Sequence, residues 1–375
     1  MRRIYLDYNA STPIDPVVAA AMRPFLDDHF GNPSSEHWTA VGAKAALEEA
    51  RGKVASLLGT ENDEIIFTSG GSESNNLALK GVAWALNSKG NHIITSAIEH
   101  PAILGPCRFL EQQGFAVSIV PVDGFGRIAP DDVRRAITPR TILISVMHAN
   151  NEVGTIQPIA EVSRIAREHG ILLHTDAAQS VGKIATDVKE LGVDLLTIAG
   201  HKVYAPKGVG ALHVRRGILL EPLIHGAGHE GGRRAGTESA LLAVGLGKAC
   251  ELARDLAPME GVKVLRDRLW QRLNAVFGDR VVLNGHPDLR LPNTLNVSFA
   301  GQVGADVLAR LNGVAASTGS ACHTGSVELS PVLKAMGIAQ EVGMGAIRFS
   351  LGRGTTREEI DTVTDQLAGV LAAAT

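Results

Sequence analysis

The sequence predicts an α/β protein with a mostly parallel sheet of about seven strands, followed by a smaller C-terminal α/β unit. Between about Glu64 and Val214, short β-branched runs alternate with longer segments of helical spacing, as in parallel strands joined by helices. After Leu241 this alternation gives way to a long helical stretch that reaches about Phe277. A chain of 375 residues with 45% hydrophobic content can bury a core large enough for such a sheet.

Each element has its own local pattern. The expected strands are short apolar runs at residues 64–68, 92–95, 116–121, 141–147, 171–174, 194–198 and 209–214. Helical spacing bounded by Gly or polar turn residues falls between them, at residues 72–87, 102–113, 159–169 and 181–191. The second unit has expected strands at 294–299 and 346–350 and expected helices near 305–311 and 357–373. We therefore expect a large domain over residues 16–255 and a small domain made from residues 1–15 and 256–375.

Composition excludes several kinds of partner. The chain has 36 Lys and Arg against 39 Asp and Glu, a net charge of −3, without long runs of one sign. It lacks the electrostatic pattern of a protein that binds nucleic acid or an anionic membrane, so a small-molecule partner is expected. Its 3 cysteines include no CxxC pair, which argues against a disulfide framework and a zinc ribbon, and no metal site is predicted.

The N-terminal sequence gives no sign of export. Residues 1–13 lack the apolar stretch of a signal peptide. No apolar run approaches the roughly 18 residues needed to span a bilayer. We expect a cytoplasmic protein without a membrane segment.

A glycine-rich turn follows the first strand of the expected sheet. In Thr68-Ser69-Gly70-Gly71-Ser72-Glu73-Ser74 the strand ends and a helix begins, so free backbone N–H groups and the positive end of the helix would meet. This arrangement suits an anion, but it is not a Walker loop, because no Gly-Lys-[Ser/Thr] follows. A simple connecting turn explains the glycines equally well when the segment is considered alone.

Two charged residues follow strands of the expected sheet. Asp176 comes after the strand at 171–174, and ligands of open parallel sheets bind outside the carboxyl ends of the strands. It could equally be the N-cap of a following helix. Lys202 comes just after the strand at 194–198, where desolvation would favour the neutral amine that Schiff-base chemistry needs. Alone it could be a surface lysine; beside Asp176 and the glycine-rich turn, we favour a reactive lysine.

One of the cysteines lies in an unusual context. Cys322 is surrounded by small polar residues from Ser317 to Ser326, which predicts the exposure that a reactive thiolate requires. Cys107 and Cys250 lie among apolar residues and are predicted to be core residues. The neighbouring His323 is either an acid or thiolate partner of Cys322 or a solvated loop histidine.

Taken together, these segments resemble the cysteine desulfurase and selenocysteine lyase family. These are pyridoxal-5′-phosphate (PLP) enzymes of aminotransferase class V, with the fold-type I architecture. The similarity covers nearly the whole chain and is carried by Tyr5-Leu6-Asp7-Tyr8-Asn9-Ala10, Gly31-Asn32-Pro33-Ser34-Ser35, the turn at 68–76, Glu99-His100, His148-Ala149-Asn150-Asn151-Glu152, the run 174–179, Gly200-His201-Lys202, the run 234–238, and Cys322 to Arg348-Phe349-Ser350-Leu351-Gly352-Arg353.

The resemblance assigns a role to each matching residue. It implies that Lys202 is the Schiff-base lysine, that Asp176 pairs with the pyridinium nitrogen, and that Gln179 hydrogen-bonds the ring oxygen. The other matches are His100, stacked on the ring face with a catalytic role, Asn151 near the substrate and ring oxygen, Gly71, Ser72, His201 and Thr237 at the phosphate, and Arg348 on the substrate carboxylate. In the family, the counterpart of Thr237 reaches the cofactor of the opposite subunit, so a homodimer is implied.

The implied reaction converts L-cysteine to L-alanine. Cys322 would take the sulfur as a persulfide and pass it to an acceptor, with iron–sulfur cluster biogenesis as the pathway that many relatives serve. The alternative is a selenocysteine lyase, which releases selenide from L-selenocysteine. The Cys322-His323 pair resembles this branch of the family. The chain departs from the family at Ala199, often a serine, and ends at Thr375 without the longer tail offered to an iron–sulfur scaffold. Delivery to such a scaffold therefore does not follow from the resemblance.

Two other functions are compatible with parts of this sequence. An ordinary class V aminotransferase or kynureninase-like lyase would share Asp176 and Lys202 but would have no use for the loop around Cys322. A catalytically silent interaction protein on the same fold would not need Lys202, Asp176 and Arg348 together. Both are therefore less favoured than the desulfurase.

Overall fold

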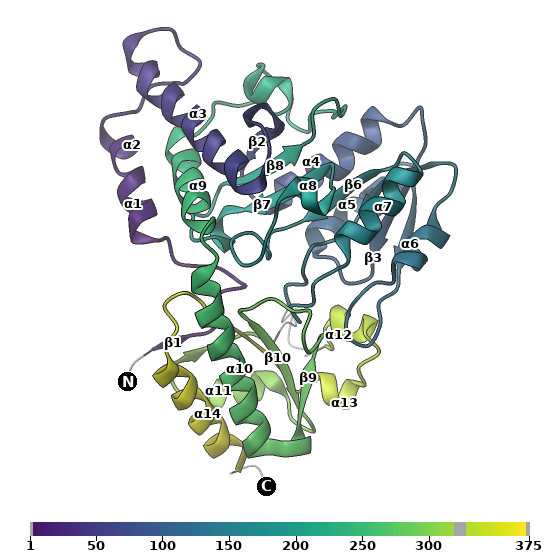
Figure 1. Ribbon diagram of the computed structural model, residues 1–375, viewed down its shortest axis with the longest axis vertical. Helices are drawn as coiled ribbons and strands as arrows, with labels where there is room; N and C mark the ends of the chain where they lie inside the picture. Colours follow the sequence, from purple (N-terminus) through teal and green to yellow (C-terminus); the bar gives the residue numbers. More distant parts are fainter. Residues whose placement is uncertain (1–2, 319–327, 373–375) are drawn as a thin grey trace.

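The computed structural model describes residues 3–318 and 328–372 and arranges them in two layered parts, one above the other in Figure 1. The upper part contains a seven-stranded sheet, in the order β2-β8-β7-β6-β5-β3-β4. β8 pairs antiparallel with both β7 and β2, and the other four pairings are parallel. The strands are β2 (Ile65–Thr68), β3 (His92–Ser96), β4 (Ala116–Val120), β5 (Thr141–Ser145), β6 (Leu172–Asp176), β7 (Leu195–Ala199) and β8 (Gly210–Val214). The predicted mostly parallel, seven-stranded sheet is confirmed.

Helices cover both faces of this sheet, because neighbouring strand residues point to opposite sides. In β7, Leu195 belongs to the hydrophobic core under α4 (Gly71–Ala85) and α5 (Pro101–Gln112), whereas Leu196 belongs to the core on the other face. The helices that contribute to that second core are α1 (Pro16–Met22), α3 (Trp38–Leu58), α6 (Pro130–Ala136), α7 (Ile159–Glu168), α8 (Val188–Leu191) and α9 (Ala240–Ala253). The short α2 (Pro24–Asp27) follows α1.

The lower part is built on a three-stranded antiparallel sheet. β10 (Thr294–Phe299) pairs with β9 (Val281–Asn284) on one side and β12 (Ala346–Ser350) on the other. A separate core forms where the long helix α10 (Ala257–Phe277) and α14 (Arg357–Ala372) cover this sheet. The remaining elements are β1 (Ile4–Tyr5), paired in parallel with β11 (Val314–Ala315), and α11 (Gly304–Arg310), α12 (Pro331–Ala335) and α13 (Gln340–Gly343).

Two helix predictions were wrong. The segment 181–191 is helical only from Val188, because Asp187 accepts hydrogen bonds from the N–H groups of Lys189 and Glu190 and so starts the helix late. The stretch from Leu241 to Phe277 is two helices rather than one: α9 ends at Ala253 and α10 begins at Ala257. At this break, the side chain of Asp255 accepts from the N–H of Ala257. Figure 1 shows α10 continuing from the upper part into the lower one.

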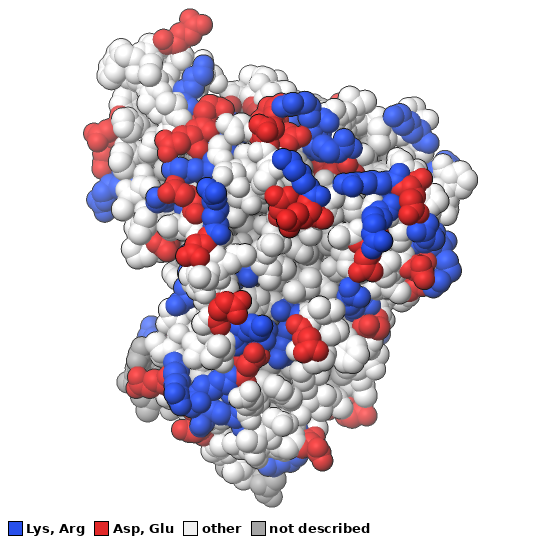
Figure 2. All heavy atoms as spheres, in the orientation of Figure 1, with Lys and Arg blue, Asp and Glu red and all other residues white. Residues whose placement is uncertain are grey.

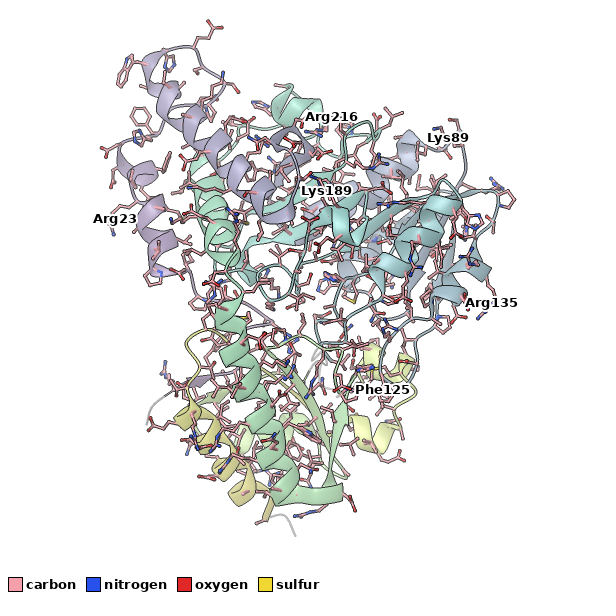
Figure 3. All side chains as sticks on the ribbon, viewed as in Figure 1. Arg23, Lys89, Phe125, Arg135, Lys189 and Arg216 are labelled. Atoms are coloured by element: carbon pink, nitrogen blue, oxygen red, sulfur yellow. The ribbon has the colours of Figure 1, made fainter. Side chains whose placement is uncertain are left out.

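The charged side chains are distributed over the surface. Figure 2 shows Lys and Arg interleaved with Asp and Glu over the face in view, and Figure 3 shows Lys89 and Arg135 at the edge of the upper part. None of the helices within the described residues combines the length and the apolar character needed to cross a membrane. Among residues 3–318 and 328–372, no group of three or more His, Cys, Asp or Glu side chains is placed to hold a metal ion.

A buried ion pair joins α3 to the loop before α9. Glu230, with a left-handed backbone at φ 50°, accepts two hydrogen bonds from the guanidinium of Arg51, at 2.7 and 3.0 Å. The same carboxylate accepts from the N–H of Phe67 in β2, at 2.9 Å. Arg51 is 8% exposed and Glu230 is 6% exposed, so neither charge can be hydrated if its partner is removed.

We predict that Arg51→Met destabilises the protein by about 3–5 kcal/mol, because it leaves the Glu230 carboxylate buried without its counter-charge. The matched control is Arg216→Met, which removes a comparable arginine pair with Asp63 at the exposed surface. The control should have the same midpoint of urea unfolding as the wild type. Equal unfolding midpoints for Arg51→Met and the wild type would contradict this account.

Candidate active site

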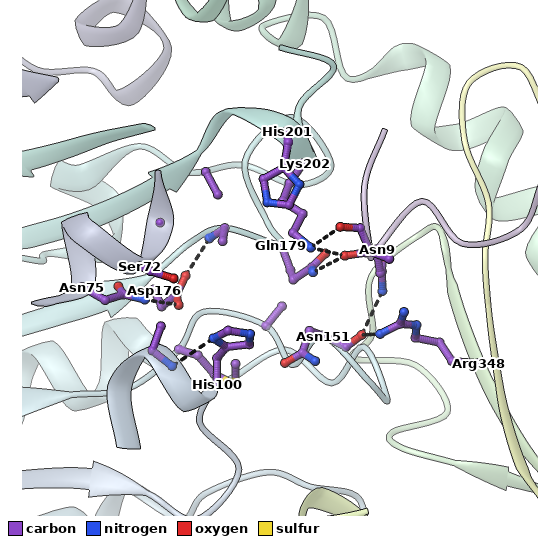
Figure 4. Close-up of a pocket in the computed structure, with 17 residues that line it drawn as sticks. Asn9, Ser72, Asn75, His100, Asn151, Asp176, Gln179, His201, Lys202 and Arg348 are labelled. Carbon is purple, nitrogen blue, oxygen red and sulfur yellow. Dashed lines mark hydrogen bonds between the residues drawn. The ribbon is translucent and has the colours of Figure 1, made fainter. Parts of the chain in front are cut away.

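A cavity of about 410 Å³ lies where strands of the upper sheet end, facing the lower part. β2, β3, β5, β6 and β7 point in the same direction, so the residues that follow them meet at one edge of the sheet. The cavity is lined from both parts of the molecule (Figure 4), by Asn9, Ala10, Gly71, Ser72, Asn75, His100, Ala102, Met147, Ala149, Asn151, Asp176, Ala178, Gln179, Ala199, His201, Lys202 and Arg348. Nine of the predicted site residues are among them: Gly71, Ser72, His100, Asn151, Asp176, Gln179, His201, Lys202 and Arg348.

The glycine-rich turn forms one end of the cavity. Gly70 is the N-cap of α4 with φ 151°, a conformation suited to glycine, and it provides no side-chain cap for the first N–H groups of the helix. Gly71 packs closely on β7, because a Cβ placed there would lie 3.1 Å from the Cβ of Ala199. His201 also lines the cavity, and burial lowers its pKa to about 4, so that its ring is neutral near pH 7. Free helix N–H groups beside a neutral imidazole form a suitable anion site.

Asp176, the last residue of β6, provides a fixed carboxylate in the cavity. It is 6% exposed; one oxygen accepts from the N–H of Ala178 at 2.9 Å, and the other from the amide Nδ2 of Asn75 at 2.7 Å. The N-cap alternative for Asp176 is wrong, because the next helix begins only at Val188. Asn75 was missed from the sequence, although it lies one helical turn after Gly71 in α4 and therefore on the same face.

Lys202 follows β7 in a short turn and points its amine into the cavity. Its Nζ donates to the backbone carbonyls of Asn9 and Ala10, the latter at 2.8 Å. Burial, followed by the positive charge of Arg348, lowers the pKa of Lys202 to about 8. A substantial fraction of this amine is therefore neutral, and nucleophilic, near physiological pH.

Arg348 extends from β12 of the lower part toward the same cavity. Its Nη2 donates to Asp7 at 2.7 Å, and its Nη1 donates to the carbonyl of Asn151 at 3.0 Å. Its Nε is buried and has no hydrogen-bond partner within the described residues. An arginine held on two sides with an unused donor is suited to a carboxylate ligand. Asp7 belongs to the motif noted in the sequence but had no predicted role.

His100 lies on the opposite side of the cavity from His201 in the view of Figure 4. It is the N-cap of α5, and its Nδ1 accepts from the N–H of Ala102 at 3.0 Å. This bond fixes both the ring orientation and the tautomer, with the proton on Nε2. Burial lowers the pKa of His100, so the neutral ring is favoured.

Two predicted site residues are not among the described residues that line this cavity. Thr237 lines a different cavity, together with Ser69 and Arg234. Cys322 lies outside the described residues. The last described segment before it is adjacent to the site, since Ser317 exchanges two backbone hydrogen bonds with Arg348. Cys107 and Cys250 are buried, as predicted, and burial raises the pKa of each thiol to about 12.

Comparison with known proteins identifies the family of this chain. The model of the family "Aminotransferase class-V" matches residues 4–363. The chain belongs to the class-V aminotransferase family. It is 51% identical to a cysteine desulfurase IscS of Dictyoglomus turgidum over 99% of this chain and 95% of that protein. It is 49% identical to the cysteine desulfurase IscS of Methanosarcina thermophila over 97% of this chain and 91% of that protein.

Solved structures show the same relationship. A NifS-like protein superposes with a TM-score of 0.93 at 37% identity, over 99% of this chain and 100% of that one. SspA, solved in complex with cysteine, superposes with a TM-score of 0.85 at 40% identity, over 94% of this chain and 100% of that one. The predicted fold-type I architecture and the predicted family are therefore confirmed.

PLP is the cofactor of this class-V family member, as predicted. The residues present fit the group. The cavity has an anion site at the start of α4, the Asp176 carboxylate for a cationic ring nitrogen, and a lysine amine with a lowered pKa. The buried, unpartnered Nε of Arg348 leaves a donor for the carboxylate of an amino acid.

We predict that Lys202 of the cofactor-free protein reacts with an amine-selective reagent at a rate that rises through about pH 8 and levels off above it. The neutral amine is the reactive form, and the lowered pKa places half-neutralisation at about 8. A lysine of a model peptide, with a pKa of about 10.4, should still gain reactivity well above that pH. Arg348→Gln should move the inflection to higher pH, because the charge of Arg348 lowers the pKa of Lys202. Peptide mass spectrometry at the Lys202 peptide measures both, and an inflection near pH 10 in the wild type would contradict the prediction.

Proposed function

We propose that this protein is a PLP-dependent cysteine desulfurase that converts L-cysteine to L-alanine and receives the sulfur on Cys322. The observation that carries this proposal is the convergence of Asp176, Lys202 and Arg348 on one cavity, with an anion-binding turn at its other end. The names of the relatives, cysteine desulfurases at about half identity over nearly the whole chain, give the same substrate. Each residue role below is part of the proposal.

The cofactor would be held at both ends by groups of this chain. Gly71, Ser72 and His201 would bind the phosphate, Asp176 would pair with the ring nitrogen, and Gln179 would donate to the ring oxygen. His100 would stack on the ring face, where its bond to the N–H of Ala102 keeps the ring in place. When bound, PLP supplies an electron sink that makes the bonds at the substrate Cα labile.

The substrate would be oriented by Arg348 and deprotonated by Lys202. The guanidinium would hold the α-carboxylate, with Asp7 and the carbonyl of Asn151 keeping it in position. Lys202 would hold the cofactor and, as a neutral amine, would take the proton from the substrate Cα. A pKa of about 8 suits this second task, because the amine can gain and lose the proton near pH 7.

Cys322 would perform the sulfur transfer. Its thiolate attacks the substrate sulfur; the new S–S bond forms as the Cβ–S bond breaks, and that bond's electrons stay with the carbon. The carbon is then protonated and the product leaves as alanine, with a persulfide on Cys322. The reaction needs a free thiolate, which a reducing compartment preserves. We propose an acceptor protein as the next recipient of the sulfur.

We predict that Cys322→Ala lowers alanine formation from L-cysteine by orders of magnitude, because sulfur must be taken by a nucleophile before the C–S bond breaks easily. Selenium is a better leaving group, so the variant should keep a sizeable share of its activity on L-selenocysteine. Lys202→Ala is the control that should abolish both reactions. The measurement is alanine release together with sulfide or selenide.

Three outcomes of this experiment separate the candidates. Intact desulfuration by Cys322→Ala would exclude the persulfide step. Equal loss on both amino acids would remove the support for selenocysteine lyase activity, which rests on the Cys322-His323 pair. Wild-type protein that acts on neither amino acid would exclude the proposed function.

We also propose a homodimer in which Thr237 completes the phosphate site of the partner subunit. Thr237 lies away from the cavity of its own chain, and the nearby Arg234 ties its segment to α4 through a hydrogen bond to Glu73 at 2.8 Å. The segment is therefore fixed to the same helix that begins at the anion site.

We predict that Thr237→Val weakens PLP binding about tenfold or more, since a hydrogen bond to a charged group is lost. Mixing Thr237→Val subunits with inactive Lys202→Ala subunits should restore activity, because one site of each mixed dimer has Lys202 and a partner with Thr237. The control is each variant mixed with itself. A fully active monomer in sedimentation, or no recovery on mixing, would contradict the dimer.

A further inference from the structure

Lys183 is a buried lysine that lies directly behind the cavity. It is 8% exposed, and its Nζ donates to Gln179 Oε1 at 2.9 Å and to Asn9 Oδ1 at 3.2 Å. Both of these acceptors belong to residues that line the cavity, whereas Lys183 is not among the described residues that do so. Lys183 therefore contacts the lining of the cavity at Gln179 and Asn9, whose side chains Figure 4 shows.

The environment of Lys183 is unfavourable for a structural lysine. Within residues 3–318 and 328–372 its amine has no carboxylate partner. Burial, followed by the positive charges of Lys202 and Arg348, holds the pKa of Lys183 well below its usual value. A buried amine without a counter-charge costs stability, and such groups occur most often at functional sites.

The contacts of Gln179 define which way its side-chain amide points. Its nitrogen Nε2 lies 3.0 Å from the backbone carbonyl of Asn9, which can only accept a hydrogen bond. Its oxygen Oε1 must therefore be the atom that faces the amine of Lys183. An amide nitrogen carries two hydrogens, so one remains for a ligand in the cavity.

We propose that Lys183 is a positioning residue that holds the Gln179 amide with its nitrogen toward the cavity, ready to donate to the ring oxygen of the cofactor. Gln179 is 5% exposed, so without the donor from Lys183 its Oε1 would be buried and unsatisfied. The amide would then rotate or withdraw to find another donor, and the nitrogen would be lost from the cavity. This inference rests on the proposed function, because it needs PLP to lie against Gln179.

The test is a titration of full-length, cofactor-free protein with PLP, followed by visible absorbance. Lys183→Met keeps the length of the side chain and removes its donors, and we expect about tenfold weaker PLP binding. Lys189→Met is the matched control, because Lys189 is an exposed lysine on the neighbouring α8 (Figure 3). The Lys189→Met protein should bind PLP with the affinity of the wild type.

A double-mutant cycle separates positioning from a general effect on the fold. If Lys183 acts through Gln179, then adding Lys183→Met to Gln179→Met should weaken PLP binding by less than about threefold further. Additive losses, or unchanged affinity of Lys183→Met alone, would overturn the proposal. Should Lys183→Met not fold, as judged by circular dichroism, Lys183→Leu, which also removes the donors, takes its place in the same cycle with the same criteria. Failure of the wild type to bind PLP would instead overturn the proposed function and leave no cofactor for Gln179 to contact.

Discussion

The hydrogen bonds of Asn9 are the constraint on which the site depends, because they join the two parts of the molecule at the cavity. Its backbone N–H donates to the hydroxyl of Ser350 and its Nδ2 to the hydroxyl of Thr294, each at 2.9 Å, and both partners belong to the lower sheet. Its carbonyl accepts from Lys202 and Gln179 of the upper part. Asn9 is 1% exposed, so each of these bonds is shielded from water. A fully satisfied buried amide has one favourable arrangement, and it therefore fixes where the reactive amine lies relative to β12.

The electrostatics of the cavity follow from this closeness of the two parts. Arg348 comes from the lower part and Lys202 from the upper part, and the positive charge of the one lowers the pKa of the other. Asp7 offsets part of this repulsion by pairing with Arg348 at 2.7 Å. The result is a lysine that is neutral often enough to react, beside an arginine that stays in place to bind a carboxylate. Neither property could arise if the two parts were separated.

Sequence patterns predicted the sheet and most of the cavity because both depend on local order. Strand limits agreed to within about two residues, since β-branched runs bounded by turns identify buried strands. Asp176 and Lys202 were found because ligands gather at the ends of parallel strands. The missed residues act through pairs distant in the chain: Asn75 contacts a residue 101 positions away, and Asp7 contacts one 341 positions away. No local pattern indicates such a pairing. The helix predicted at 181–191 was wrong for a different reason: the apolar residues at its start lie in buried turns.

Glu99 supports the site as a neutral carboxyl group and therefore adds no negative charge to the cavity. Glu99 precedes His100, and its Oε1 accepts from the N–H of Met147, so it ties the start of α5 to the loop after β5. Burial, with a smaller effect from Asp176, raises the pKa of Glu99 to about 8, and the group is mainly protonated at pH 7. A neutral carboxyl group can be buried at far lower cost than a carboxylate. It holds the start of α5 and the loop after β5 together by hydrogen bonding, while the carboxylate that we propose as the partner of the cofactor's ring nitrogen is that of Asp176.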